Sequence, residues 1–294
     1  MIYYQVRAIM NILTGNSTFE PEKRRQSQGK AMTTLDCTLK QAQKFDPTLI
    51  ASTISLQTGD ELQARQERSI CEECHLRSLC LSKTLDADGL EELNRVVRHH
   101  RPVRKGQHLF RQEDEFKSLF VIRAGAAKSY RTSIDGEELG VSFFLPGEML
   151  GLDGLYRKKY TNSVIALEDM FVCEFPFRAL EKLLATQPLM QRHFNELQSL
   201  QILQEQEMLL LHSQKTADGQ LAAFLINLSQ RQKRLKLSPV SFRLPMTRKD
   251  IASCLGLASE TMSRLFANFQ RKSWVNVKGR EITLTNMSAL CSFM

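Results

Sequence analysis

Short apolar runs separated by glycine occupy the middle of the chain, from about Arg101 onward. Four runs, rich in β-branched and aromatic residues, cover residues 105–114, 118–130, 135–151 and 163–176. Lys-Gly, Ala-Gly, Asp-Gly and Pro-Gly pairs punctuate them, and Asp135-Gly136 is a strong hairpin signal. The pattern predicts an antiparallel barrel or roll.

A helical pattern follows this region. Its apolar residues recur at helical intervals, at Met190, Phe194, Leu197, Met208 and Leu211. Pro188 suits a helix start, and no proline or glycine follows until Gly219. Some thirty residues of helix would be about 45 Å long, too long for one small domain, so we expect a connector that pairs with its twin in a dimer. Because Gln201 and Gln204 interrupt the apolar stripe, a buried core helix is the alternative.

Two short helices joined by a glycine are predicted near the end of the chain. Thr247 can cap the first helix, with Asp250 three residues on in a capping-box arrangement. Gly256 permits the sharp turn, and Ser259 can cap the second helix. The inner face of that second helix would be Met262, Leu265, Phe266 and Phe269. This arrangement is a helix-turn-helix.

The second helix carries side chains suited to reading DNA. Its outward residues include Glu260, Ser263 and Arg264. Arginine can bond guanine O6 and N7 together, glutamate can accept from a cytosine amino group, and serine is a flexible donor. A hairpin that turns at Lys278-Gly279 would form a wing, with Lys278 and Arg280 near phosphates. We therefore expect double-stranded DNA as a partner.

The charge distribution strengthens this expectation. The net charge of +8 is uneven: residues 1–70 hold 9 basic and 7 acidic side chains, residues 71–214 hold 18 and 21, and residues 215–294 hold 13 and 4. The excess positive charge therefore lies in the last 80 residues, as expected when one domain faces a polyanion. A basic domain that is merely soluble is the alternative.

The first 70 residues are polar and predict a largely disordered extension, whose translation could also start at Met32. No window approaches 18 uninterrupted apolar residues, and the N-terminal stretch lacks a convincing signal-peptide cleavage site. Seven cysteines in a chain this large do not suggest a secreted disulfide framework. We expect a cytoplasmic protein with no membrane partner.

Three cysteines, Cys71, Cys74 and Cys80, lie within ten positions. A tetrahedral metal or cubane site needs a fourth partner, and the candidates are His75, Cys37, Cys173, Cys254 and Cys291. The spacing is not the pair of pairs usual for structural zinc, although zinc is compatible with it. Three thiols from a flexible loop and a fourth from a strand, such as Cys173, would suit a [4Fe–4S] cluster. Iron–sulfur, zinc and inert thiols all remain open on spacing alone.

The order of these parts, with phrases such as "KSLFVIRAGAAKSY", "VCEFPF" and "SETMSRLFANFQ", resembles the CRP/FNR superfamily of transcription regulators, closest to its oxygen-responsive FNR/ANR type. The match runs from about Cys71 to the end. It implies an α+β fold: an N-terminal β-roll like a cyclic-nucleotide-binding jelly roll, a long dimerisation helix and a C-terminal winged helix-turn-helix. The implied domains are an extension at 1–70, a cysteine loop and sensor roll at 71–187, the dimerisation helix at 188–214, and the DNA-binding domain at 215–294, with its helix-turn-helix at about 248–267.

The resemblance also implies roles for individual residues. The implied cluster ligands are Cys71, Cys74, Cys80 and Cys173, and the implied base-reading residues are Glu260, Ser263 and Arg264. A [4Fe–4S] cluster would promote homodimerisation without oxygen and binding to a TTGAT-N4-ATCAA-like site, with RNA polymerase as a partner in activation. His75, directly after the second cysteine, departs from the small residue expected there, which bears on how long the cluster lasts in air.

Other functions of the same architecture can be tested against the sequence. In the phosphate cassette that binds cyclic nucleotides, Leu152 stands at the glutamate position and Asn162-Ser163 at the Arg-Ser pair. Without the arginine, a cyclic phosphate has no bidentate partner, so no cyclic nucleotide is expected. A zinc-stabilised or cluster-free regulator with a different effector is the alternative. An enzyme that uses Cys71-x-x-Cys74 for thiol exchange lacks the βαβ context and is not expected.

Overall fold

The structure is a computed structural model that describes residues 71–99, 102–212 and 216–293. The expected extension at 1–70, the Met32 start and the candidate ligand Cys37 lie outside these residues. No helix in the described part of the chain combines the length and the apolarity that crossing a bilayer requires. The cysteine segment (residues 71–84) comes first and holds two 3-10 turns, η2 (Arg77–Leu79) and η3 (Leu81–Thr84).

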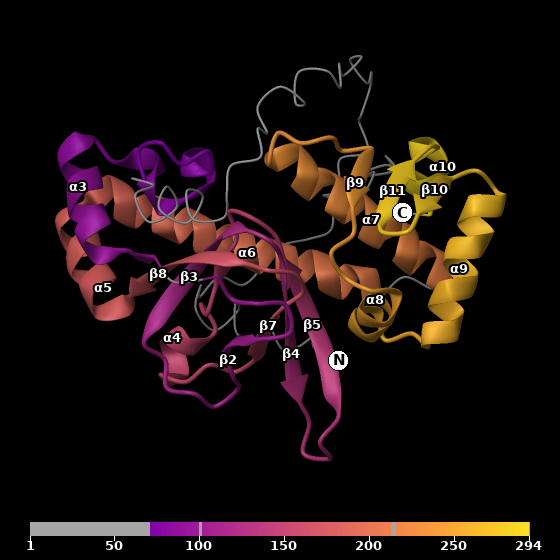
Figure 1. Cartoon of the computed structure of the whole chain (residues 1–294), viewed down its shortest axis with the longest axis horizontal. Helices are drawn as coiled ribbons and strands as arrows, with labels where there is room; N and C mark the ends of the chain where they lie inside the picture. The colour runs from indigo at the N-terminus through magenta and orange to yellow at the C-terminus, as the bar shows by residue number, and fades with distance from the viewer. Residues whose placement is uncertain (1–70, 100–101, 213–215, 294) are drawn as a thin grey trace, which may run out of the picture. The chain divides into compact units, whose positions relative to one another are not determined.

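Two antiparallel four-stranded sheets form the β-roll (residues 98–176), the magenta part of Figure 1. The first sheet has the order β1 (Arg98–His99), β8 (Phe171–Pro176), β3 (Ser118–Ala124) and β6 (Met149–Leu150). The second has the order β2 (His108–Phe110), β7 (Ser163–Ala166), β4 (Ala127–Thr132) and β5 (Glu138–Phe144). A short helix, α4 (Gly154–Arg157), follows β6. The roll predicted from the glycine-separated runs is confirmed.

Turn chemistry and aromatic packing explain why these runs close into a roll. Gly136 has φ +82°, in the left-handed region, between the paired strands β4 and β5, which confirms the predicted hairpin. Inside the roll the rings of Phe110 and Tyr160 stack with centroids 3.9 Å apart. Both side chains belong to one buried apolar cluster that joins the roll to its flanking helices. Burial of such aromatic side chains dominates the stability of a core of this kind.

Three helices accompany the roll on the chain's path to its C-terminal part. α3 (Ala87–Val96) precedes β1 and contacts α5 (Phe177–Thr186), which directly follows β8 (Figure 1). The next helix, α6 (Pro188–His212), has 25 residues, shorter than the thirty predicted. The following helix is α7 (Ala217–Arg234). Thr216 caps its start, because the Thr216 side chain accepts a hydrogen bond from Gly219 N at 3.1 Å.

The burial of α6 changes along its length. Met190 and Phe194, near its start, are buried in the core cluster. Further along, large apolar side chains are exposed: Leu200, Ile202, Leu203, Leu209 and Leu210. The buried core helix considered as the alternative therefore describes only the first part of α6.

The winged domain (residues 217–293) contains α7, α8 (Arg248–Leu255), α9 (Ser259–Arg271) and α10 (Met287–Cys291), with a sheet of order β10 (Val275–Lys278), β11 (Glu281–Leu284) and β9 (Ser241–Arg243). The capping box at the start of α8 is confirmed, since Thr247 and Asp250 exchange side-chain to backbone bonds. Gly256 has φ +67° and ends α8 as predicted. The predicted cap at Ser259 is wrong by one position: Ala258 is the cap residue and Ser259 is already helical, with no side-chain cap.

Candidate metal centre and nucleic-acid interface

The cysteine segment folds as consecutive 3-10 turns rather than as the irregular loop that the sequence suggested. Arg77 N donates to Cys74 O at 2.9 Å, and Cys80 N donates to Arg77 O at 3.2 Å. Cys71 N donates to Asn94 Oδ1 of α3 at 3.2 Å. Leu81, the first residue of η3, is fully buried. These bonds fix the backbone around Cys71, Cys74 and Cys80.

Cys173 comes to this segment from the sheet. It lies on β8, as predicted, and its main chain is opposite His99 of β1 and Val121 of β3. Its Sγ lies 3.7 Å from His99 Nδ1. The thiol is buried in the core cluster with Cys71, and Cys80 packs against the same cluster.

Burial and mutual repulsion raise the pKa values of the buried thiols. Burial, with smaller contributions from the neighbouring Cys80 and Cys74, raises the pKa of Cys71 to about 11. Burial also raises the pKa of Cys173 well above its ordinary value, with added repulsion from Cys80, Cys71 and Cys74. Arg123 of β3 acts in the opposite direction on both groups. The structure thus places Cys71 and Cys173 in one buried cluster with Cys80 packed against it, and Cys74 lies in the same segment.

This donor set fits a thiolate-bound metal group in its chemistry. Four thiolates in an apolar site repel one another, and a positively charged metal centre relieves that cost and deprotonates the thiols. Among the described residues, however, no three Cys, His, Asp or Glu side chains are already arranged around a single metal position. The four sulfurs are therefore neighbours without the spacing of a closed coordination sphere.

The other candidate ligands lie elsewhere or are exposed. Cys254, on α8, is buried, which raises its pKa to about 12, and its Sγ donates to Val141 O at 3.7 Å. Cys291 is at the end of α10, and His75 is exposed on the cysteine segment. Sequence reasoning missed His99 and Arg123 as neighbours of the site, because only the strand register brings them there.

The recognition helix α9 presents its predicted reading face to solvent. Glu260, Ser263 and Arg264 are exposed, whereas the predicted inner face, Met262, Leu265, Phe266 and Phe269, is buried. Ser263 Oγ donates to Ser259 O at 3.0 Å, one turn back. Within the described residues neither Glu260 nor Arg264 has a hydrogen-bond or ion-pair partner, so both side chains are available to base edges.

The wing has the shape expected from the sequence. Val275 to Lys278 pair with Glu281 to Leu284, and Gly279 has φ +63° at the tip. Lys278 is exposed. Arg280 donates to Pro245 O at 3.3 Å, so part of its guanidinium is used within the domain. Lys278 is thus the freer of the two predicted phosphate contacts.

A cavity of about 390 Å³ lies between the β-roll and α6. Its described lining includes Asp153, Asn162 and Glu205 but no arginine or lysine. Asp153 Oδ2 accepts from Thr161 N at 2.9 Å and from Asn162 Nδ2 at 3.1 Å. The two carboxylates give the cavity an acidic character, which disfavours an anionic ligand.

Comparison with known proteins places these features in context. Residues 100–187 match the family "Cyclic nucleotide-binding domain", and residues 219–293 match the "Crp-like helix-turn-helix domain". The chain is 40% identical over 235 residues to "Transcriptional activator protein FnrA" of Stutzerimonas stutzeri, covering 80% of this chain and 96% of that protein. It is 40% identical to "Fumarate and nitrate reduction regulatory protein" of Yersinia pestis, covering 75% of this chain and 88% of the relative.

The fold has a solved counterpart as well. The structure of FixK2 from Bradyrhizobium japonicum superposes with a TM-score of 0.61 at 25% sequence identity, covering 67% of this chain and 97% of that one. The likeness extends over roll, long helix and helix-turn-helix, the same three parts that were predicted from the sequence pattern.

Proposed function

The chain belongs to the CRP/FNR family of transcription regulators, on its FNR-like side, and on that premise we propose that it is an oxygen-responsive global regulator whose [4Fe–4S] cluster promotes homodimerisation and DNA binding without oxygen. The observation that carries this proposal is the packing of Cys71, Cys173 and Cys80 at one buried cluster, with Cys74 in the same segment. The genes under its control would be those of anaerobic respiration and metabolism.

The four cysteines would hold the cluster, and their positions suggest how it acts. When bound, a [4Fe–4S] cluster supplies an oxygen-labile link between its four sulfur ligands. Three of these ligands belong to the cysteine segment, and η3 of that segment packs against α6. His193 of α6 holds the pKa of Glu196 below its usual range, and Lys83 of η3 adds to this effect. The order of the cysteine segment would therefore influence the position of the first half of α6.

Homodimerisation through α6 is supported by its exposed apolar residues. Five large apolar side chains of α6 are exposed in a single chain: Leu200, Ile202, Leu203, Leu209 and Leu210. A second copy of α6 would bury them, as in a coiled coil. To shift a monomer–dimer balance from 1:99 to 99:1, the cluster-bound and cluster-free forms must differ by about 5.5 kcal/mol in their preference for the dimer.

The proposed DNA contacts follow from α9 and from dimerisation. Two copies of α9 about one helical turn apart would read two half-sites, such as those in TTGAT-N4-ATCAA. Arg264 is suited to a guanine and Glu260 to a cytosine, with Ser263 as a donor to base or phosphate. The proposed division of labour is a sensor at 71–187, a dimerisation helix at 188–214 and a DNA-binding domain at 215–294.

Several narrower points belong to the same proposal. RNA polymerase is the proposed partner in activation, the protein is not an enzyme, and it acts in the cytoplasm. No cyclic nucleotide is expected, since Asn162 stands where the cyclic phosphate would require an arginine, and the described lining of the cavity between roll and α6 contains no arginine or lysine. The alternative function is a regulator of the same fold that carries zinc or no metal and answers to another effector.

Metal analysis and a visible spectrum of protein purified strictly without oxygen separate these functions. About four iron and four sulfide per subunit, with a broad band near roughly 400 nm that bleaches in air, is the expected result. A colourless protein with stoichiometric zinc would overturn the oxygen sensor and leave the zinc-stabilised DNA-binding protein.

A further inference from the structure

One short turn of the β-roll touches both the cysteine segment and the winged domain. This β5–β6 turn (residues 145–148, Leu-Pro-Gly-Glu) connects β5 to β6. It is anchored to β3, because Gly147 N donates to Ile122 O at 2.8 Å and Ile122 N donates to Glu148 O at 3.2 Å. Leu145 N also donates to Glu148 Oε2 at 2.9 Å, which fixes the carboxylate relative to the turn.

One side of the turn lies against the cysteine segment. Gly147 has φ +84°, and a β carbon at this position would lie 3.3 Å from both Cβ and Cδ1 of Leu79. Leu79 is therefore packed on the backbone of Gly147, and Leu79 directly precedes Cys80. A displacement of Cys80 moves the side chain that covers the turn.

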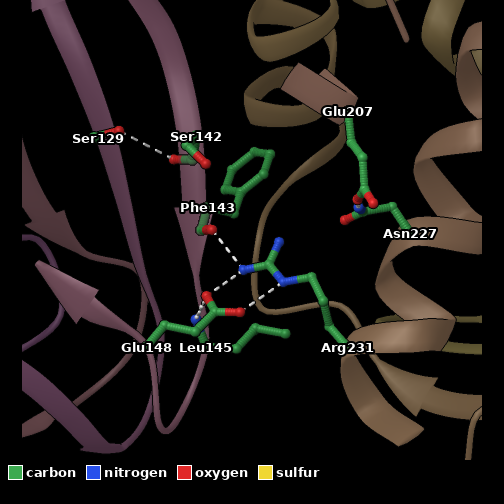
Figure 2. Close-up of polar contacts among 8 residues, drawn as sticks. All are labelled: Ser129, Ser142, Phe143, Leu145, Glu148, Glu207, Asn227 and Arg231. Carbon is green, nitrogen blue, oxygen red and sulfur yellow. Dashed lines mark hydrogen bonds and ion pairs between the residues drawn. The ribbon is translucent and has the colours of Figure 1, made fainter. Parts of the chain in front are cut away.

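The other side of the turn holds Arg231 of α7 (Figure 2). Arg231 Nε donates to Glu148 Oε1 at 2.8 Å, and its Nη2 donates to Glu148 Oε2 and, at 2.6 Å, to Phe143 O. The exposed fractions of the two side chains are 9% and 18%. Figure 2 shows the guanidinium pointing from α7 at the end of β5 and the turn.

Burial makes this contact sensitive to small movements. A desolvated charge pair is favourable only with good geometry and satisfied hydrogen bonds, and either partner alone would be an uncompensated buried charge. The Arg231–Glu148 pair is therefore favourable only while the turn and α7 keep this geometry, and a small shift of either would open it to water.

Other contacts between the roll and the winged domain are less suited to this role. Lys128 Nζ lies 2.6 Å from Asp250 Oδ1, and Arg243 Nη1 lies 2.5 Å from Glu168 Oε2. Arg243 is half exposed, so solvent compensates for its loss. Unlike these contacts, the Arg231–Glu148 pair involves the β5–β6 turn, and Leu79 of the cysteine segment packs on the same turn.

We propose that the β5–β6 turn carries the state of the cysteine segment to α7 within one subunit, with Arg231 as a positioning residue for the winged domain. The inference rests on the proposed function, and it adds an intramolecular route to the one through dimerisation. A cluster-bound cysteine segment would hold Leu79 on Gly147, Glu148 in place and α7 docked. Without the cluster these contacts would persist but would open more often, so that α7 would exchange faster.

The test is amide hydrogen exchange of α7 in the full chain, in cluster-loaded and cluster-free forms. In the wild type, cluster loading should slow exchange of α7 at least about fivefold. Glu148→Gln should remove that difference while iron, sulfide and the monomer–dimer equilibrium stay as in the wild type. Arg243→Gln, the matched control at an exposed contact between the same parts, should keep the difference. An unchanged difference in Glu148→Gln would overturn the proposal.

A second measurement does not depend on the cluster, so it separates the proposal from failure of the oxygen sensor. In cluster-free protein, Leu79→Ala should speed exchange of α7 several-fold, and should add nothing in the Glu148→Gln background. Independent, multiplicative effects of the two substitutions would show that Leu79 and Glu148 are not coupled and would overturn the proposal. A wild type without iron and sulfide would overturn the sensor alone.

Discussion

Cys173 and His99 face each other across β8 and β1, with Cys173 Sγ 3.7 Å from His99 Nδ1. The strand pairing fixes the position of this thiol, whereas the other three proposed ligands lie on turns of the cysteine segment. Cys173 therefore provides the stationary end of the proposed site, and the segment provides the end that can move.

Substitution Cys173→Ser tests the fourth ligand. It should abolish bound iron and sulfide, because the oxygen of serine is a poor substitute for thiolate in an iron–sulfur cluster. The fold should persist, at a cost of about 1–3 kcal/mol for the buried hydroxyl. Iron and sulfide assays with thermal unfolding measure both effects. Cys254→Ser, a buried thiol on α8, is the control and should retain the cluster. Full iron and sulfide in Cys173→Ser would refute the ligand assignment.

Substitution Glu205→Ala tests whether this carboxylate lowers the affinity between subunits when the cluster is absent. Glu205 is an exposed carboxylate on α6, and Gln201 Nε2 lies 3.5 Å from its Oε1. Pairing of two α6 helices would desolvate this charge and bring it near its twin. The variant should dimerise about tenfold more tightly without the cluster, about 1.4 kcal/mol. Sedimentation of cluster-free protein measures this, and an unchanged monomer fraction would count against the idea.

Substitution Arg264→Ala tests direct reading of DNA. It should cost about 1–3 kcal/mol on the cognate duplex and relax the preference for guanine at one position, whereas Lys278→Ala should weaken all sequences alike and lower the salt slope by about one. Binding titrations on cognate and scrambled duplexes at several salt concentrations distinguish the two. If Arg264→Ala lost affinity equally on both duplexes, Arg264 would be a phosphate contact.

Substitution Asp250→Asn tests the contact between α8 and the roll through its pH dependence. Burial opposes ionisation of Asp250, but bonds from Lys128 and Thr247 outweigh it and hold the pKa below its usual range. A carboxyl with a lowered native pKa stabilises the fold above its unfolded pKa of about 3.9, and that stabilisation is lost as pH falls through the native value.

Asp250→Asn should therefore lower the free energy of unfolding by about 1 kcal/mol at neutral pH. The difference from the wild type should shrink as the pH falls below about 4. Denaturant unfolding at a series of pH values measures it. A difference independent of pH would mean that the charge of Asp250 contributes nothing.

Much of the fold was predictable because it depends on local chemistry. The capping box of Thr247 and Asp250, the left-handed Gly256 and the buried face of α9 all follow from neighbours in sequence. The hairpin at Gly136 is of the same kind. The boundary expected after residue 214 lies close to the end of α6 at His212, but the sequence analysis did not predict that Thr216 caps α7. A side-chain cap of this kind stabilises the start of a helix by only about 1 kcal/mol, so it leaves little trace in the apolar pattern.

The site was predictable only in part. The spacing of Cys71, Cys74 and Cys80 pointed to a site, and the family resemblance supplied Cys173. Its neighbours His99 and Arg123 depend on strand register, which the sequence pattern did not reveal. The contact of Arg231 with Glu148 joins residues 83 positions apart and likewise depends on tertiary packing.

The most direct test of the oxygen switch is a titration of a labelled TTGAT-N4-ATCAA duplex with one anaerobic preparation, before and after exposure to air. The account predicts that affinity falls at least about tenfold as iron and sulfide are lost, and that the protein shifts from dimer to monomer in the same interval. Equal affinity before and after complete loss of the cluster would contradict it.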